Sequence, residues 1–325
     1  VAHDEALPVP AAPSTRRLAR ELGVELREVE GSGPGGRVLA EDVQSAAGTE
    51  AEAVPERERE AGPEERREAG AEEKRREESA RALPDFSRWG EIERIPLRSV
   101  RRATARAMAR AWSEIPHVMH HERVDITELE AFRQAQADRV EARGGHLTLT
   151  VLAMKAAVAA LREFPRFNAS LDSGRDEIVL KHHYHLGVAV ATERGLLVPV
   201  VRDVDRKGVA ELAVELTELA GRARKGEVER ADMEGGTFTL TNVGSIGGTL
   251  FTPIVYHPQV AILGLARASW QPVVQGGARG RIEPRLLLPL CLAFDHRVVD
   301  GAEAARFANH LAASLQDPQA LLLAL

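Results

Sequence analysis

Apolar residues recur at two different periods from about residue 85 onward, and these periods predict a mixture of helices and strands. Spacing of three or four residues predicts helices over 98–114, 125–142, 147–165, 207–226 and 301–315. Alternating or short continuous apolar runs predict strands over 117–125, 184–193, 195–204, 235–244, 259–268 and 285–294. This order of elements predicts an α+β fold, in which helices lie on a mostly antiparallel sheet.

The first of these helices has one apolar face and a defined end. Its apolar residues at helical spacing are Val100, Ala103, Ala107, Met108, Ala111 and Trp112. Pro116 ends the helix, because proline cannot continue the hydrogen-bonded ladder. We therefore expect this face to pack against the sheet.

The N-terminal part of the chain divides differently. Residues 1–12 are rich in Ala and Pro and are expected to form a linker. Residues 13–47 predict a very small helical domain, with Ser14 as the N-cap of a helix that Gly23 ends. The candidate core of this domain is Leu18, Leu22, Val24, Leu26, Val29, Val38, Leu39 and Val43. Residues 48–84 are expected to be a mobile charged linker, because residues 50–81 hold twelve acids, eight bases and almost no large apolar side chains.

Composition excludes several classes of protein. The net charge of −6 gives no overall basic surface for nucleic acid, and no apolar run reaches the length of a membrane-spanning helix. The single cysteine, Cys291, excludes a disulfide framework and favours a reducing compartment such as the cytoplasm. The first residue is valine, so we expect the chain to be a fragment or a processed product.

The stretch LCLAFDHRVVDGAEAARF, residues 290–307, places His296 at the end of an apolar strand, with Asp300 and Gly301 just after it. A histidine at a strand end is most often structural, and Asp-Gly is also a common turn. Burial of the preceding strand would favour a neutral imidazole, which can act as a general base near neutral pH. A nearby carboxylate could orient the ring, directly or through an arginine.

A second candidate lies in TFTLTNVGSIGGTLF, residues 237–251. The threonines Thr237, Thr239 and Thr241 alternate along a strand that runs into a glycine-rich turn. Such a strand is common and needs no function. A hydroxyl beside a tight turn can also donate a hydrogen bond to an oxyanion.

Two other motifs carry no predicted site. The histidines of 117–121 and 182–185 lack Cys, Asp or Glu partners at metal-ligand spacing, so we predict no metal site. The loop GSGPGG, residues 31–36, lacks the Gly-Lys-Ser/Thr ending and the preceding strand of a phosphate-binding loop.

Several segments together closely resemble the dihydrolipoyl acyltransferase components of 2-oxo acid dehydrogenase complexes. The resemblance is carried by DHRVVDG, FTLTNVGSIGGTLFTPIVYHPQVAILG, IPHVMHHERVDITELE and DFSRWGEIERIPLRSVRRATARAMA. PSTRRLARELGVELREVEGSGPGGRVLAEDV resembles the peripheral subunit-binding domain of the same family. The two modules stand in the family's order, which makes the resemblance specific.

The resemblance implies a chloramphenicol acetyltransferase-like catalytic domain over residues 85–325. Such domains form trimers with active sites in channels between subunits, and the trimers build a cubic or dodecahedral shell. The family's histidine falls on His296 and the following aspartate on Asp300. Thr241 stands where the family usually has a serine, and its added methyl alters the rotamers open to the hydroxyl.

In the small domain, the resemblance places partner-contacting positions on Ser14, Arg16, Arg20 and Arg37. The arginines would bind acidic patches on the 2-oxo acid decarboxylase or on dihydrolipoamide dehydrogenase. The family's acyl carrier is a lipoyl group on a lipoyl domain, and this sequence has no such segment. We therefore expect that domain to have been removed, or to be supplied by another polypeptide.

The implied reaction is acyl transfer from S-acyldihydrolipoamide to coenzyme A, with His296 as the base, Thr241 as the oxyanion donor and Asp300 holding local structure. GSIGGTLFTP and DHRVVDGAEAARF look most like the acetyltransferases of pyruvate complexes, and branched-chain acyltransferases are the alternative. A non-catalytic scaffold that anchors dihydrolipoamide dehydrogenase would be expected to lack His296. An antibiotic acetyltransferase would be expected to lack the subunit-binding module.

Overall fold

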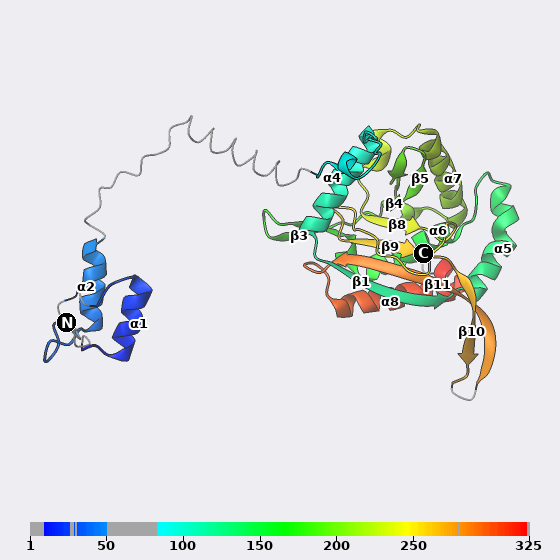
Figure 1. Ribbon diagram of the computed structural model, residues 1–325. Coiled ribbons are helices and arrows are strands. Elements are labelled where there is room, and N and C mark those ends of the chain that lie inside the picture. The colour runs from blue at the N-terminus through cyan, green and yellow to red at the C-terminus, as the bar shows by residue number, and fades with distance from the viewer. Residues whose placement is uncertain (1–9, 27–28, 30, 51–82, 278–279, 324–325) are drawn as a thin grey trace. The chain divides into compact units, whose positions relative to one another are not determined.

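The computed structural model describes residues 10–26, 29, 31–50, 83–277 and 280–323. The chain divides into two compact units between Glu93 and Arg94 (Figure 1). The linker predicted over 48–84 falls mainly on residues 51–82, and the one predicted over 1–12 falls mainly on residues 1–9. Both stretches lie outside the described residues, so the predicted linkers and domain boundaries stay predictions.

The first unit holds the helices α1 (Pro13–Leu22) and α2 (Ala40–Glu50). The N-cap of α1 is Ala12, not Ser14 as predicted, because Pro13 takes the first helical position, where its missing N–H and fixed φ suit the helix. Gly23 ends the helix in the left-handed conformation, with φ of 70°, as predicted.

The core of the first unit is smaller than its sequence suggests. Its buried members are Ala19, Val38 and Val43, whereas Leu22 and Leu39 are exposed. Asp42 ties the glycine-rich loop to α2, because its carboxylate accepts hydrogen bonds from the backbone N–H groups of Ser32 at 3.0 Å and Leu39 at 2.8 Å. These bonds compensate for a core too small to order the loop alone.

The second unit contains long helices and a large sheet. Its α-helices in the described residues are α4 (Ser99–Glu114), α5 (Thr127–Glu141), α6 (Leu149–Glu163), α7 (Val209–Lys225), α8 (Gly301–Gln316) and α9 (Pro318–Leu323). Its strands there are β1 (His117–Asp125), β2 (Ala169–Asp172), β3 (Glu177–Leu180), β4 (Leu186–Val188), β5 (Val190–Thr192), β6 (Gly195–Leu197), β7 (Val200–Val201), β8 (Phe238–Asn242), β9 (Ala261–Leu265), β10 (Ser269–Gln275) and β11 (Arg281–Asp295). No helix in these parts of the chain has the length and apolar character needed to span a bilayer.

The main sheet has the order β1-β11-β9-β8-β4-β7, and β10 pairs with the first half of β11. The β4–β8 and β8–β9 pairs are parallel and the other pairs of this sheet are antiparallel, which confirms the predicted mostly antiparallel α+β architecture. The hairpins β2–β3 and β5–β6 lie apart from it. The β10–β11 ribbon, which the sequence did not predict, projects from the body of the unit (Figure 1).

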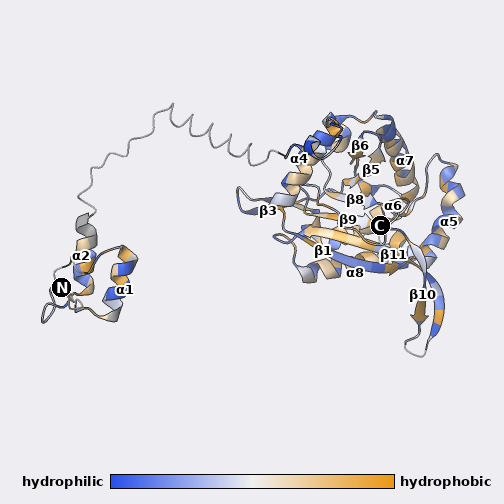
Figure 2. Ribbon diagram, in the orientation of Figure 1, coloured by the Kyte–Doolittle hydropathy of each residue, from blue (hydrophilic) through white to orange (hydrophobic). Residues whose placement is uncertain are grey.

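Strand alternation gives the sheet two chemically different faces. One face presents large apolar side chains such as Phe238, Leu240 and Leu263 to a core that also includes residues of α6 and α8. The apolar character of α6, β9 and β11 is visible in Figure 2. The opposite face carries smaller or polar residues, namely Thr239, Thr241, Ile262, Gly264, Cys291 and Ala293. Thr241 therefore lies on the face that is free of large apolar core side chains.

The apolar face predicted for the helix over 98–114 forms, but this chain leaves most of it uncovered. Ala111 is the buried residue of α4, whereas Trp112 is 58% exposed. The helix rests on the second face through Ala111 near its C-terminal end, where Ala111 packs with Ile262 and Ala293. The rest of its apolar face borders a cavity rather than a packed core.

Candidate active site

His296 is the first residue of the turn that follows β11. Burial continues through Asp295, which is 3% exposed, but the side chain of His296 is exposed. The burial expected to favour a neutral ring is therefore not provided by this chain alone. The backbone N–H of His296 donates to the carbonyl oxygen of Pro116 at 3.2 Å, and its ring lies 6.1 Å from that of Phe294. Neither ring nitrogen has a hydrogen-bond partner within the described residues, so both are open to a substrate.

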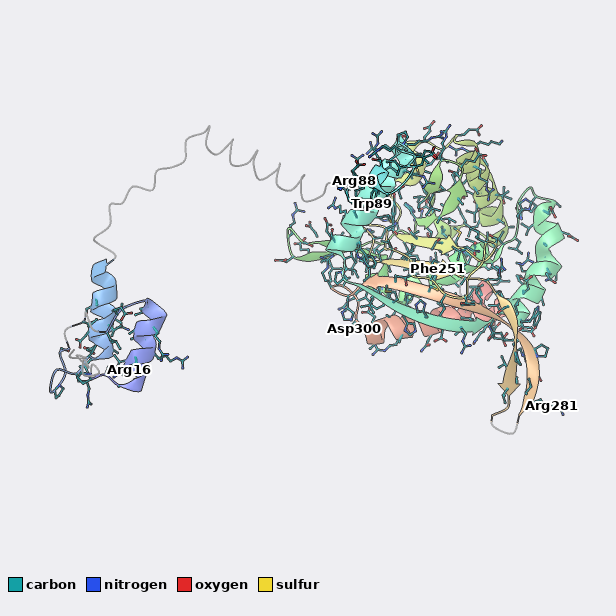
Figure 3. The ribbon with its side chains drawn as sticks, viewed as in Figure 1. Arg16, Arg88, Trp89, Phe251, Arg281 and Asp300 are labelled. Carbon is teal, nitrogen blue, oxygen red and sulfur yellow. The ribbon has the colours of Figure 1, made fainter. Side chains whose placement is uncertain are left out.

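Asp300 is the N-cap of α8 (Figure 3). Its carboxylate accepts a hydrogen bond from the backbone N–H of Glu303 at 2.8 Å, and this bond lowers the pKa of Asp300. Among the described residues, no hydrogen bond or ion pair joins Asp300 to His296. The carboxylate therefore fixes the start of the helix that follows the turn and does not orient the imidazole.

Thr241 has a free hydroxyl, unlike the two threonines that precede it at alternate positions. The hydroxyl of Thr237 donates to the carbonyl oxygen of His185 at 3.2 Å. The hydroxyl of Thr239 donates to Oε1 of Gln259 at 2.7 Å. The hydroxyl of Thr241 has no hydrogen-bond partner in the part of the chain that the structure describes. It is therefore the threonine of this set that can donate to a bound oxygen atom.

Thr241 lies on the wall of an apolar cavity of about 450 Å³. The cavity is enclosed by α4, by β6 and by the segment 251–256, and most of its lining is aliphatic or aromatic. A hydrogen bond made in such surroundings is stronger than one made in water, because the local dielectric constant is low. The cavity could thus hold an apolar chain with a carbonyl group against the Thr241 hydroxyl.

Phe251 narrows this cavity beside Thr241. Gly264 is the register partner of Thr241 on β9, and the ring of Phe251 lies so close to it that an added methyl group would overlap the ring. A glycine within a strand often marks such a close approach. The sequence analysis did not single out Phe251, although the glycine in the run AILGL was a usable signal.

The structure does not bring His296 and Thr241 together within one chain. Thr241 is level with Gly264, which is level with Cys291, and His296 lies five residues beyond Cys291 along the chain. Five residues at about 3.3 Å and two strand spacings of about 4.8 Å separate the two Cα atoms by about 19 Å. A single reacting group cannot touch both side chains of the same copy.

A second cavity, of about 370 Å³, lies at the C-terminal end of β8. Its lining includes Arg133, Thr148, Asn242 and Arg267. Arg267 donates through Nε to the carbonyl oxygen of Gly244 at 3.0 Å, which holds its guanidinium beside the glycine-rich turn. Because Thr241 and Asn242 are adjacent in β8, their side chains point to opposite faces of the sheet, so the apolar and the polar cavity lie on opposite sides of the end of this strand.

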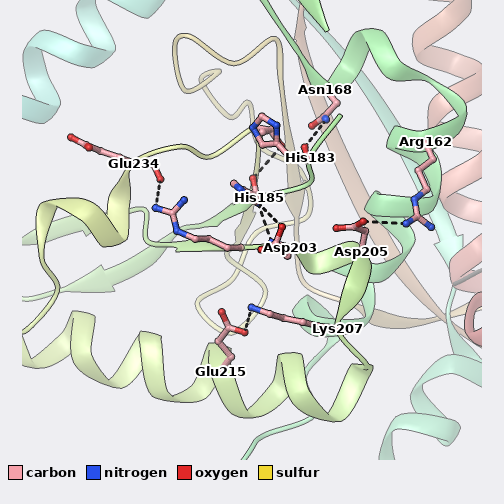
Figure 4. Close-up of polar contacts among 11 residues, drawn as sticks. Arg162, Asn168, His183, His185, Asp203, Asp205, Lys207, Glu215 and Glu234 are labelled. Carbon is pink, nitrogen blue, oxygen red and sulfur yellow. Dashed lines mark hydrogen bonds and ion pairs between the residues drawn. The ribbon is translucent and has the colours of Figure 1, made fainter. Parts of the chain in front are cut away.

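Two of the clustered histidines, His185 (Figure 4) and His117, form hydrogen bonds with backbone groups. Nδ1 of His185 accepts a hydrogen bond from the backbone N–H of Asp203 at 3.0 Å, and burial lowers the pKa of His185. His117 is bonded on both sides, by Nδ1 to the carbonyl oxygen of Ile115 at 2.8 Å and by Nε2 to the N–H of Val255 at 3.0 Å. In the described ranges no three His, Cys, Asp or Glu residues are grouped so that they could hold a metal ion.

The residues predicted to contact a partner lie on the surface of the first unit. Arg16 (labelled in Figure 3) and Arg20 are one turn apart on α1. Nε of Arg20 donates to the carbonyl oxygen of Arg16 at 3.3 Å. Ser14 is exposed at the start of the helix. Arg37 is exposed and precedes Val38, which pairs with Ala11 just before α1. Ser14 and Arg37 are thus near the same end of α1.

Two family models match the chain. Residues 90–323 match the catalytic domain of the 2-oxoacid dehydrogenases acyltransferases, and residues 9–44 match the e3 binding domain. The dihydrolipoyllysine-residue acetyltransferase component of the pyruvate dehydrogenase complex from Azotobacter vinelandii is 47% identical over 315 residues, which are 97% of this chain and 47% of that protein. The chain thus spans about half the length of this relative.

Solved structures agree with these matches. A structure of Azotobacter vinelandii dihydrolipoamide acetyltransferase has a TM-score of 0.72 and 46% identity, covering 74% of this chain and 98% of that one. It was determined to study a serine, a histidine and an asparagine in the catalytic mechanism. A structure of the cubic core of the pyruvate dehydrogenase multienzyme complex has the same score, identity and coverage. These neighbours confirm the acyltransferase fold expected for the second unit.

Proposed function

The chain belongs to the family of 2-oxoacid dehydrogenase acyltransferases, and on that premise we propose that its catalytic domain moves an acetyl group from S-acetyldihydrolipoamide to coenzyme A. The observation that carries the proposal is the free hydroxyl of Thr241 on the wall of an apolar cavity. His296 supplies the base, with both ring nitrogens open. The solved acetyltransferase was studied for a histidine and an asparagine four residues apart, the spacing that separates His296 from Asp300 here.

In the proposed reaction, the imidazole of His296 takes the proton of the coenzyme A thiol, and the thiolate attacks the thioester carbonyl. The hydroxyl of Thr241 donates to the oxyanion of the tetrahedral intermediate. Collapse of the intermediate breaks the bond to the lipoyl sulfur. That sulfur takes the proton back from the imidazolium, so the products are acetyl-coenzyme A and dihydrolipoamide. Asp300 keeps α8 and the turn before it in place.

Two copies must share each site, because His296 and Thr241 of one copy are about 19 Å apart by strand spacing. We infer that the chain assembles so that His296 of one copy faces Thr241 of the next. This agrees with the trimers and intersubunit channels that the family resemblance implies. The relative whose structure is a cubic core supports a further assembly of trimers into a shell.

The chemistry of the two cavities suggests which substrate occupies each. The apolar cavity suits the aliphatic arm of the lipoyl group, which serves as the acyl carrier. The polar cavity suits the phosphates of coenzyme A through Arg267, because guanidinium groups bind phosphate oxygens, whereas Arg133 is already paired with Glu130 of the same lining. The thiol-bearing arm of coenzyme A would then have to pass the end of β8 to reach Thr241.

The position of Phe251 favours acetyl over branched acyl groups. An acyl carbonyl bonded to Thr241 would place its alkyl substituent beside the ring that lies on Gly264. A methyl group is the smallest such substituent, whereas an isobutyryl or isovaleryl group needs the space that the ring occupies. A branched-chain acyltransferase is therefore the second candidate, with Phe251 as the residue that argues against it.

For the small domain, we infer binding to dihydrolipoamide dehydrogenase, supported by the match to the e3 binding domain. Ser14, Arg16, Arg20 and Arg37 would contact an acidic patch on that partner. The 2-oxo acid decarboxylase is a second partner for the same surface. A cytoplasmic location fits the single buried cysteine.

The test of the proposed function is acetyl transfer between coenzyme A and dihydrolipoamide, measured on the assembled chain. We expect turnover with the wild type and a loss of about a hundredfold or more in His296→Ala, the scale of a positioned general base. Light scattering should show the same assembly for both proteins. Equal turnover of wild type and His296→Ala would instead favour a scaffold without catalytic function.

A further inference from the structure

The two residues that flank His296 bind each other. The carboxylate of Asp295 accepts hydrogen bonds from three groups of Arg297: from its backbone N–H at 3.0 Å, from Nε at 3.0 and 3.2 Å, and from Nη2 at 2.6 Å. Asp295 is 3% exposed, and the ion pair raises the pKa of Arg297. A carboxylate buried this deeply would be costly without its cation, so the pair is a fixed part of the turn.

The backbone of Asp295 is fixed as firmly as its side chain. Its N–H donates to the carbonyl oxygen of Val260 at 2.8 Å, which ties the turn to the residue before β9. Its carbonyl oxygen accepts from the N–H groups of Val298 and Val299, both at 3.1 Å. The path of the chain on either side of His296 is therefore fixed by hydrogen bonds from both the backbone and the carboxylate of Asp295.

The surroundings of the pair contain other charged groups, but none of them replaces either partner. Glu114 is paired with Arg110 at 2.9 Å, and Nε2 of His257 lies 3.6 Å from Glu114. Within the described residues, Asp295 is the carboxylate that forms an ion pair with Arg297. The contact is thus a dedicated pair between positions 295 and 297.

We propose that Asp295 and Arg297 are positioning residues that aim the imidazole of His296 at the coenzyme A thiol. The pair closes the turn that carries His296, and within the described residues no hydrogen bond ties the His296 ring to either member, so the fixed turn sets the direction in which the imidazole leaves the backbone. The inference rests on the proposed acyl transfer. The inference adds that the rate of acetyl transfer depends on the Asp295–Arg297 ion pair, called the clamp below, although neither residue touches a substrate. Asp300, in contrast, holds the start of α8.

The test compares variants of graded severity in the assembled protein. Arg297→Lys keeps the charge but loses the two-point contact, Arg297→Met removes the cation, and the double variant Asp295→Asn/Arg297→Met removes both charges. The double variant keeps the test valid if Arg297→Met alone does not fold. A matched control is Arg222→Met, which breaks the Arg222–Asp232 pair between α7 and the 3-10 helix at 230–233.

We expect turnover to fall by about tenfold in Arg297→Lys and by about a hundredfold in Arg297→Met and the double variant, because a misaligned base transfers protons poorly. The KM for coenzyme A should stay within about twofold. The loss should also shrink by about tenfold for each pH unit as the thiol approaches its own pKa of about 8.5, because a thiolate needs no base. The control should keep normal turnover.

Normal turnover in both Arg297→Met and the double variant would overturn the clamp while leaving the proposed function intact. A loss that is the same at every pH would also overturn it, since that result means a general structural defect. If the unaltered chain transfers no acetyl group, the proposed function fails first, and the clamp fails with it.

Discussion

A complementation experiment tests the proposed shared site most directly, because in that proposal the base and the oxyanion donor come from different copies. His296→Ala lacks the base in every site, and Thr241→Val lacks the hydroxyl in every site while keeping a side chain of similar shape. When the two variants are co-expressed in equal amounts, some interfaces join an intact His296 to an intact Thr241. Activity should then reappear in a mixture of two defective proteins.

The expected magnitude follows from the geometry. A site is complete when one copy has His296 and the next has Thr241, so random mixing restores half times half, or about a quarter, of the wild-type sites. Thr241→Val alone should lose about 10²- to 10³-fold in turnover, which is the effect of removing one oxyanion donor, about 2.7–4 kcal/mol. The mixture should therefore be at least about 25 times more active than either parent.

The assay is acetyl transfer to coenzyme A at matched total protein, with a physical mixture of separately assembled parents as the baseline. Thr237→Val is the matched control for Thr241→Val, because its hydroxyl bonds the His185 carbonyl oxygen instead of facing the cavity. It should cost about 1 kcal/mol of stability and leave turnover normal. If the co-expressed variants are no more active than the parents, despite mixed assemblies seen by mass spectrometry, the two-copy site is refuted.

Three further outcomes are expected. Phe251→Ala should raise the rate with isobutyryl relative to acetyl donors by about tenfold or more, and an unchanged ratio would remove Phe251 from acyl selection. Arg20→Glu should weaken the binding of dihydrolipoamide dehydrogenase and reduce the salt dependence of that binding, while acetyl transfer stays normal. An unchanged affinity in calorimetry would mean that Arg20 faces solvent and does not contact the partner. Asp300→Ala should lower the Tm at neutral pH. Because the pKa of Asp300 is lowered in the folded state, this difference should fade as the pH falls below about 4; a constant difference at pH 3 would contradict the capping role.

Elements with a strong periodic pattern could be predicted from the sequence, because burial enforces the pattern. The helix at 207–226 and the strand at 285–294 correspond to α7 and to the end of β11, whose apolar residues face the core. The helix α4 shows the limit. Its apolar positions are spaced for packing, but this chain alone does not cover them, and periodicity cannot tell whether the covering surface belongs to the same copy.

Only part of the candidate site could be predicted from the sequence, because the rest depends on tertiary contacts that local patterns do not encode. The motif gave His296 and Asp300, and strand alternation gave three threonines, among which only the family resemblance singled out Thr241. The physical reason that favours Thr241 is that Thr237 and Thr239 already donate their hydroxyl groups to other residues, and only tertiary contacts reveal this. Phe251 and the Asp295–Arg297 pair were missed because no spacing rule encodes a ring on a glycine or a salt bridge across one residue.

The separation of His296 from Thr241 has a consequence for the geometry of any assembly. In an open row of copies joined head to tail, one terminal histidine and one terminal threonine find no counterpart, so there is always one fewer site than there are copies. Only a closed ring uses every donor and every acceptor. Closing the ring therefore adds one complete active site to the assembly. For three copies, the number of complete sites rises from two to three.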